Sequence, residues 1–164
     1  MATHAPIIAP RAMTSQIVAP KRRPRQTGAM SDQTSSLNDM MPLGATLGIV
    51  AESMAPDAVV LSMPWRADLC TTGGVLHGGA VMALADSAGG ACAFANLPSD
   101  AVGTSTIESK TNFLGAVREG TVTATARPLH VGGTTIVVET ELRRDDGRLV
   151  AKTTQTQTVL RPRT

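Results

Sequence analysis

The chain has 164 residues, of which 17% are charged and 2% are aromatic, and its formal net charge is +2. This length predicts one domain with a sizeable core rather than two domains. The scarcity of aromatic residues and the absence of a basic stretch in the body of the chain argue against nucleic-acid binding as the main task.

The first 30 residues differ from the rest of the chain in charge and composition. They contain five basic residues, four prolines and no acidic residue, whereas the remaining 134 residues contain 10 basic and 13 acidic ones. A segment of this composition without hydrophobic periodicity is predicted to be disordered. Its role stays open between a dispensable tail, a localisation or anionic-surface patch and a transit peptide. We therefore predict a disordered basic tail over 1–30 and a folded domain over 31–164.

The cysteines and the apolar stretches indicate the kind of environment that the chain occupies. Cys70 and Cys92 are the two cysteines, and neither lies in a spacing typical of a disulfide framework or a metal site. We therefore expect a reduced, cytoplasmic protein without a bound metal. The most apolar stretch, 75–95, contains Asp86 and four glycines, so it is not predicted to cross a membrane.

The folded part begins near Gly44 and changes pattern along the chain. Strand patterns alternate with turn signals, one long run of small and apolar residues is typical of a helix, and a proline-containing segment ends that helix. The first half is predicted to contain strands over 45–54 and 57–65, a loop over 66–74 and a helix over about 78–95.

The second half is predicted to be a series of strands. In 121–131 the residues Val122, Ala124 and Ala126 share one face, as expected for a strand with one buried side. Asp146-Gly147 is a hairpin turn signal that precedes the last strand. The other two alternating segments cover 104–114 and 134–144.

This order of elements predicts an α+β fold in which antiparallel strands cover one long helix. The helix is apolar on nearly every face, so it must be covered nearly all round. A curved sheet would cover one side of the helix. The alanines and glycines of the helix would let strands or a second copy of the helix approach closely. Because a single sheet leaves the other side and its own edges uncovered, we expect at least a homodimer.

A lone carboxylate, Asp86, lies in the middle of this apolar helix, where it requires a partner or a function. A structural role, such as pairing with an arginine or capping a backbone group, is one alternative. Upstream, the glycines of His77-Gly78-Gly79 permit close approach of a ligand, and the first N–H groups of a helix are free donors. Such a helix start can stabilise a developing oxyanion, and Asp86 could serve the same substrate as a base or nucleophile, from the dimer partner's half of the site.

These residues also carry a family resemblance. The segments 76–79 (Leu-His-Gly-Gly), 84–86 (Leu-Ala-Asp) and 112–114 (Asn-Phe-Leu) resemble the hotdog-fold acyl-CoA thioesterases of the phenylacetyl-CoA thioesterase type. The likeness covers about residues 40–160, and the acid nine positions after the histidine in an Ala/Gly-rich helix makes it fairly specific. It implies hydrolysis of acyl-CoA to acid and CoA without a cofactor. It also implies two protomers with one continuous sheet and two sites at their interface, commonly paired into a homotetramer.

The resemblance assigns roles to single residues. Asp86 would be the catalytic carboxylate, as general base or nucleophile, and the Gly78 N–H would polarise the thioester carbonyl. His77 would shape the turn or assist carbonyl binding, although a histidine that only caps the helix is an equal alternative. Gly79 would lie against the substrate beside Gly78.

Two further positions are candidates for substrate binding. Thr71 occupies the position, six residues before His77, at which relatives usually have Asn or Gln. Ser105 matches a hydroxyl that positions the water in some relatives, and an ordinary strand serine is the alternative.

One departure from the family pattern keeps another function open. The turn 130–133 contains no lysine or arginine where relatives place one for the nucleotide phosphates, and Lys110, Arg118 or Arg127 could substitute. Together with Thr71, this keeps a non-catalytic acyl-CoA binding or sensor protein of the same fold as the alternative. Hydratase chemistry is disfavoured, because that branch pairs a histidine with an acid in a different local pattern.

Overall fold

The structure is a computed structural model that describes residues 27–163. Helix α1 (Thr27–Met40) opens this part of the chain. The predicted tail over 1–30 therefore lies outside the described residues except for positions 27–30, which belong to α1.

Two helices that the sequence patterns did not predict precede the sheet. Leu37 of α1 is buried, and Thr34 Oγ1 accepts a hydrogen bond of 3.0 Å from the backbone N–H of Ala51. Helix α2 (Pro42–Leu47) begins with a proline, whose fixed φ suits a first helical position, and ends at Gly48 with a φ of 73°. The strand predicted over 45–54 was therefore wrong in its first half.

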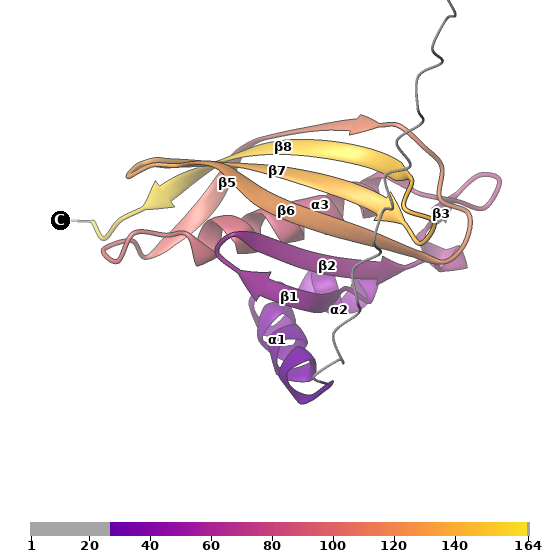
Figure 1. Cartoon of the computed structure of the whole chain (residues 1–164), viewed down its shortest axis with the longest axis horizontal. Coiled ribbons are helices and arrows are strands. Elements are labelled where there is room, and N and C mark those ends of the chain that lie inside the picture. The colour runs from indigo at the N-terminus through magenta and orange to yellow at the C-terminus, as the bar shows by residue number, and fades with distance from the viewer. Residues whose placement is uncertain (1–26, 164) are drawn as a thin grey trace, which may run out of the picture.

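The core of the fold is one antiparallel sheet of six strands in the order β1-β2-β6-β7-β8-β5. Figure 1 shows these strands curving around helix α3. The chain crosses from β2 through α3 to the opposite edge of the sheet, so β5 pairs with the last strand, β8. The bounds are β1 (Val50–Ala55), β2 (Ala58–Pro64), β5 (Gly103–Phe113), β6 (Thr121–Val131), β7 (Thr135–Arg144) and β8 (Leu149–Leu160).

The segment predicted to be a loop before the helix contains short regular pieces. A 3₁₀ turn, η1 (Ala67–Leu69), precedes the small hairpin of β3 (Cys70–Thr71) and β4 (Val75–Leu76). Gly73 and Gly74 form its tip, both with φ near +70° to +80°, a conformation that glycine adopts without strain.

Helix α3 (Gly78–Ala95) has the predicted bounds. Its sheet-facing side is fully buried, whereas Met82 is 39% and Phe94 52% exposed on the opposite side. By length and hydropathy α3 could cross a membrane, but half of it is buried inside the fold. The expectation that this helix is covered nearly all round is therefore not met within one protomer. The buried positions include Leu84, Ala85, Ala88, Cys92 and Ala93.

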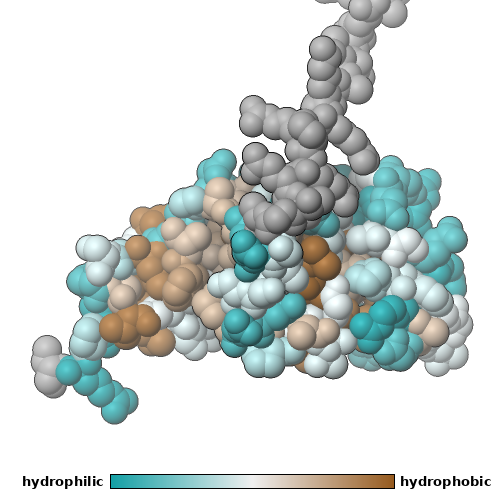
Figure 2. Space-filling view, turned by 90° about the horizontal axis from the view of Figure 1, so that it is seen from below, coloured by the Kyte–Doolittle hydropathy of each residue, from teal (hydrophilic) through white to brown (hydrophobic). Residues whose placement is uncertain are grey.

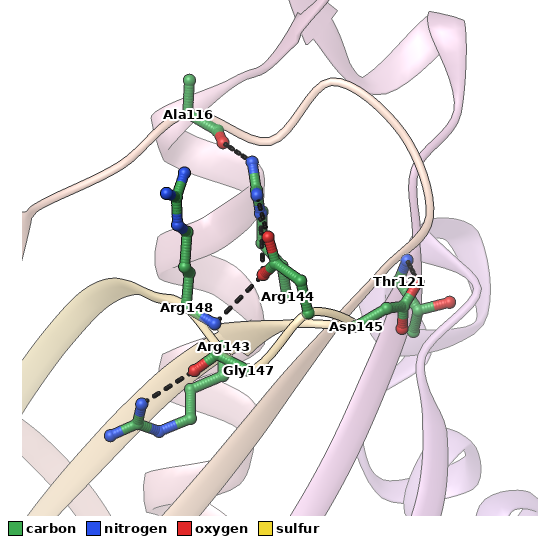
Figure 3. Close-up of polar contacts among 8 residues, drawn as sticks. Ala116, Thr121, Arg143, Arg144, Asp145, Gly147 and Arg148 are labelled. Carbon is green, nitrogen blue, oxygen red and sulfur yellow. Dashed lines mark hydrogen bonds and ion pairs between the residues drawn. The ribbon is translucent and has the colours of Figure 1, made fainter.

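The turn between β7 and β8 confirms the predicted hairpin at Asp146-Gly147. Gly147 has a φ of 81°, and its carbonyl accepts a hydrogen bond of 2.9 Å from Arg143 (Figure 3). The Asp146 carboxylate accepts hydrogen bonds from the Arg144 guanidinium and from the backbone N–H of Arg148. These contacts stabilise the charged form and lower the pKa of Asp146 to about 2.

The architecture confirms the predicted α+β class: a hotdog fold, with a curved antiparallel sheet around one long central helix. The inner face of the sheet packs on α3 through small and branched side chains, and this is where the main hydrophobic core lies. The same geometry places the open side of α3 next to the edge strand β5.

Candidate active site

Asp86 lies in the middle of α3 but on its exposed side. The expectation of a buried acid was therefore wrong for a single protomer, because the sheet covers only the opposite side of the helix. Two side chains from the sheet contact the carboxylate. Gln155 Nε2 donates a hydrogen bond of 2.5 Å to Asp86 Oδ1, and Thr106 Oγ1 lies 3.4 Å from the same oxygen.

The polar floor below Asp86 consists of four residues from β5 and β8: Thr104, Thr106, Gln155 and Gln157. Gln155 and Gln157 are 0% and 1% exposed. Gln157 Nε2 donates a hydrogen bond of 2.8 Å to Thr106 Oγ1. Thr104 Oγ1 donates one of 2.9 Å to the carbonyl of Thr158 on β8. The polar floor thus connects the carboxylate on the helix to the buried side of the sheet.

Gln155 reaches Asp86 because α3 has a glycine at position 89. A Cβ at Gly89 would lie 1.7 Å from Gln155 Oε1, so no larger residue fits while the glutamine keeps this rotamer. Gln155 Oε1 is itself buried and has no hydrogen-bond partner among residues 27–163. Such an unsatisfied acceptor typically costs about 1–3 kcal/mol.

A groove of about 340 Å³ lies beside α3 and is lined by Asp86, Gly90 and Phe94 of this helix. One side of it is polar and includes Ser105 and Thr106, so the predicted Ser105 does lie in the same groove as Asp86. The other side is apolar and rich in methionine, a flexible side chain that adapts to irregular ligands. The apolar residues are Met40, Met41, Met54, Ala91 and Phe94.

At the start of α3 the three residues of the His-Gly-Gly motif have different surroundings. His77 is the N-cap, and its Nδ1 accepts a hydrogen bond of 2.8 Å from the Gly79 N–H. Its side chain therefore caps the helix, as the structural alternative predicted, and occupies the Gly79 donor. The Gly78 N–H donates to no other group within residues 27–163.

Gly78 lies in a second groove, of about 330 Å³, which also contains Thr71 and Phe113. A Cβ at Gly78 would lie 3.1 Å from the Phe113 ring, so the glycine permits close packing of this side chain. His77 and Gly79 line a third depression together with Cys70. One protomer thus groups Gly78 with Thr71, and Asp86 with Ser105, in separate grooves.

The distance along the helix explains this separation. Gly78 and Asp86 are eight residues apart on α3, which corresponds to about 12 Å along the helix axis. A single thioester carbonyl cannot contact both groups at hydrogen-bond distance within one protomer. The two predicted catalytic groups therefore meet only if a second copy contributes one of them.

The edge strand β5 is exposed along nearly all of its length. Ile107 is 64% exposed, and Phe113 and Leu114 at the end of the strand are 53% and 57% exposed. Ser105 and Phe113 place this strand beside both grooves. The face of the molecule in Figure 2 likewise shows apolar residues gathered in patches between polar ones.

The two cysteines do not belong to the grooves' chemistry. Cys92 is fully buried, and burial raises the pKa of its thiol to about 11, as expected for a core residue rather than a nucleophile. Cys70 Sγ lies 3.2 Å from the carbonyl of Arg66. Both thiols are free, and residues 27–163 contain no group of three or more His, Cys, Asp or Glu side chains that could hold a metal.

The turn 130–133, which contains no lysine or arginine, has an arginine beside it. Arg161 Nη2 donates a hydrogen bond of 2.8 Å to the carbonyl of Gly133, and this arginine forms an ion pair with Asp100. Of the three cations predicted to substitute, Arg118 donates 2.7 Å to the carbonyl of Gly73 at the tip of the β3–β4 hairpin. The arginine next to the turn 130–133 thus comes from the C-terminal end of the chain and not from the turn itself.

Comparison with known proteins gives the class to which this fold and site belong. The model of the thioesterase superfamily matches residues 73–151, which include the whole of α3. A Saccharolobus solfataricus protein named only provisionally as an esterase is 38% identical over 102 residues, 62% of this chain and 71% of that protein. The 1,4-dihydroxy-2-naphthoyl-CoA hydrolase of Escherichia coli strain K12 is 30% identical over 116 residues, 70% of this chain and 83% of that enzyme.

A solved structure agrees with this assignment. A mutant thioesterase from Pseudomonas aeruginosa has a TM-score of 0.73 and 31% identity over 79% of this chain and 94% of that one. The chain belongs to the thioesterase superfamily.

Proposed function

We propose that this protein hydrolyses acyl-CoA thioesters to the free acid and CoA, with Asp86 as the catalytic carboxylate. The observation that carries this proposal is the position of Asp86. In a chain of the thioesterase superfamily, Asp86 lines a mostly apolar groove, and its carboxylate is held by Gln155.

The chemistry requires a carboxylate and an oxyanion donor. As a general base, Asp86 would take a proton from water while the water oxygen attacks the thioester carbon. The carbonyl oxygen would become an oxyanion, which the free Gly78 N–H at the helix start can stabilise. The C–S bond then breaks, and the CoA thiolate takes up a proton. If Asp86 attacks as a nucleophile, the C–S bond breaks as an acyl anhydride forms on its carboxylate, and the CoA thiolate leaves and takes up a proton; water then hydrolyses the anhydride to the free acid and the aspartate.

We propose a homodimer in which Gly78 of one subunit and Asp86 of the other serve one thioester. Two observations support it: the separation of about 12 Å along α3, and the exposed edge strand β5, which lies next to both grooves and carries the exposed apolar side chains Ile107 and Phe113. Pairing of two dimers, as the family resemblance implies, would give a tetramer. Light scattering at micromolar concentration tests this assembly, and a sharp monomer mass would contradict it.

The groove beside Asp86 is the site we propose for the acyl group. Its volume of about 340 Å³ lies at the lower end of the usual range for small-ligand pockets. Its methionine-rich wall suits apolar acyl groups, aryl-acetyl or medium-chain alkyl. The two free cysteines fit a reducing compartment such as the cytoplasm.

The test is release of free thiol from a panel of acyl-CoAs, from acetyl to palmitoyl and including phenylacetyl and benzoyl. We expect Asp86→Asn to lower kcat about 10²- to 10⁴-fold, the usual contribution of a positioned acid or base. Asp57→Asn, an exposed acid in the β1–β2 turn, is the control and should keep wild-type turnover. Near-wild-type kcat in Asp86→Asn would remove this residue from the mechanism.

The second candidate is a protein that binds acyl-CoA without cleaving it. Thr71 in place of an amide side chain and the uncharged turn 130–133 favour it. Under this alternative no ester in the panel is cleaved, whereas an acyl-CoA raises the Tm by stabilising the folded state.

A further inference from the structure

We propose that Gln155 is a positioning residue for Asp86 and that Gly89 is a glycine in order to admit it. This inference rests on the proposed thioesterase function. Gln155 lies on β8 and Gly89 on the buried side of α3, three residues after Asp86. Neither would contact the substrate; both would act through the carboxylate.

The contact itself is well suited to fixing a carboxylate. Gln155 is fully buried, and its backbone lies between Ser109 of β5 and Val138 of β7, so strand pairing on both sides holds it in place. Its Nε2 donates a hydrogen bond of 2.5 Å to Asp86 Oδ1. Asp86 Oδ2 makes no hydrogen bond within residues 27–163. One oxygen is thus anchored to the sheet and the other is left for water or substrate.

Packing alone does not explain the pair of Gln155 and Gly89. On β6 and β7 the fully buried residues of the inner face are mostly apolar, such as Ala124 and Val138, and Thr140 is the polar exception. Gln155 instead leaves its own Oε1 without a partner among the described residues, and in this rotamer it leaves no room for a side chain at position 89 of the helix. A glycine within a helix also lowers helix stability relative to alanine. Two apolar residues at these positions would make the fold more stable. We therefore infer that Gln155 and Gly89 are present for the contact with Asp86.

The polar floor gives Asp86 a second, weaker contact. Thr106 Oγ1 lies 3.4 Å from Oδ1 and is itself held by Gln157 Nε2 at 2.8 Å. Because the Thr106 contact is long, Gln155 is the main hydrogen-bond donor to the carboxylate among residues 27–163. Loss of Gln155 should therefore release the side chain of Asp86 to rotate, with little change in the groove where the acyl group would bind.

The first experiment replaces Gln155 by methionine, which has a similar length and no polar hydrogen. Acyl-CoA hydrolysis by the full chain should lose about ten- to a hundredfold in kcat, as expected for a hydrogen bond to a charged group. KM should change less than twofold, because substrate contacts remain, and the Tm should be unchanged or higher. Thr153→Val is the matched control: Thr153 is fully buried on the same strand, and within residues 27–163 its side chain hydrogen-bonds to Thr111, 2.8 Å away, and not to Asp86.

The second experiment tests the glycine without altering any polar group. Gly89→Ala should displace Gln155 and lower kcat by a similar factor. In a Gln155→Ala background the three atoms nearest to the added methyl group, all from the glutamine side chain, are absent, so Gly89→Ala should have no further effect on kcat. This non-additivity is what direct coupling between the two residues predicts.

Several outcomes would overturn the inference, and they differ from a failure of the proposed function. Wild-type protein that cleaves no thioester would refute the proposed function itself. If the wild type is active and Gln155→Met keeps its kcat, the positioning role is refuted. An equal loss of kcat in Thr153→Val would show a structural effect of the strand and would also refute it. An undiminished effect of Gly89→Ala in the Gln155→Ala background would refute the role of the glycine.

Discussion

Strands β6 and β8 both turn one face toward α3, yet the two faces differ in chemistry. The inner face of β6 consists of Val122, Ala124 and Ala126, all 0% exposed. The inner face of β8 includes Thr153, Gln155 and Gln157, which are as deeply buried.

The difference shows that strands of one sheet can have different roles, one in the hydrophobic core and one in support of a site. β6 contributes to the hydrophobic core, where burial of apolar area stabilises the fold at roughly 25 cal/mol per Å². β8 lies next to the edge strand β5, and these two strands together supply the polar floor below Asp86. Burial by itself therefore does not separate a core strand from one that supports a site; the polarity of the buried face does.

The largest effect on stability is expected from placing a β8-type residue on β6. Ala124→Gln would overpack the core and bury an amide with no partner, which together should destabilise the fold by about 3 kcal/mol. Thermal unfolding should show a Tm lower by about 6–12 °C. Gln155→Leu on β8 is the comparison, and we expect it to keep or raise the Tm. Equal losses in both variants would mean that the two faces contribute alike to stability.

A smaller effect is expected at the start of α3, where a polar side chain serves the fold. His77→Ala should remove the cap on the Gly79 N–H and cost about 1 kcal/mol, or about 2–4 °C in Tm. His77→Asn, which can cap in the same way, should keep both the Tm and the turnover. Turnover lost in His77→Asn at an unchanged Tm would instead assign this residue to carbonyl binding.

The smallest effect is expected at the exposed β7–β8 turn. The pKa of Asp146 is lowered to about 2, chiefly by the hydrogen bond from Arg144. The stability that its charged form contributes is therefore present above about pH 4 and is lost as the pH falls toward 2. Asp146→Asn should lower the Tm slightly at pH 7, and the difference from wild type should shrink below pH 4. A difference that stays constant over this range would show that the charge of Asp146 is not the cause.

Local patterns in the sequence were sufficient for much of the fold. The run of small residues located α3, the Asp146-Gly147 signal located the hairpin, and alternation identified the inner face of β6. The prediction was wrong where two signals competed: over 45–48 an apolar segment suggested a strand, but Pro42 and Gly48 begin and end a short helix. Helix α1 was missed because its polar residues show little periodicity.

The site was less accessible to sequence reasoning. The sequence led us to predict roles for Asp86, Gly78 and Ser105 but not for Gln155 and Thr106, which contact Asp86 in the structure. A strand with polar residues on both faces (KTTQTQT) was a signal for Gln155. Their significance depends on the pairing of β5 with β8, which places Thr106 opposite Gln157, 51 positions further along the chain. Local periodicity does not contain information on such long-range register.

The sequence by itself determined α3, most of the strands and the positions of the chemically active residue types, because periodicity and turn residues act over a few positions. Only the tertiary structure decided which side of α3 the sheet covers, and hence that Asp86 is exposed within one protomer rather than buried. It also decided that Gly78 and Asp86 lie in separate grooves and that a glutamine from the last strand holds the carboxylate. These facts follow from strand order and register, which depend on the packing of the whole chain.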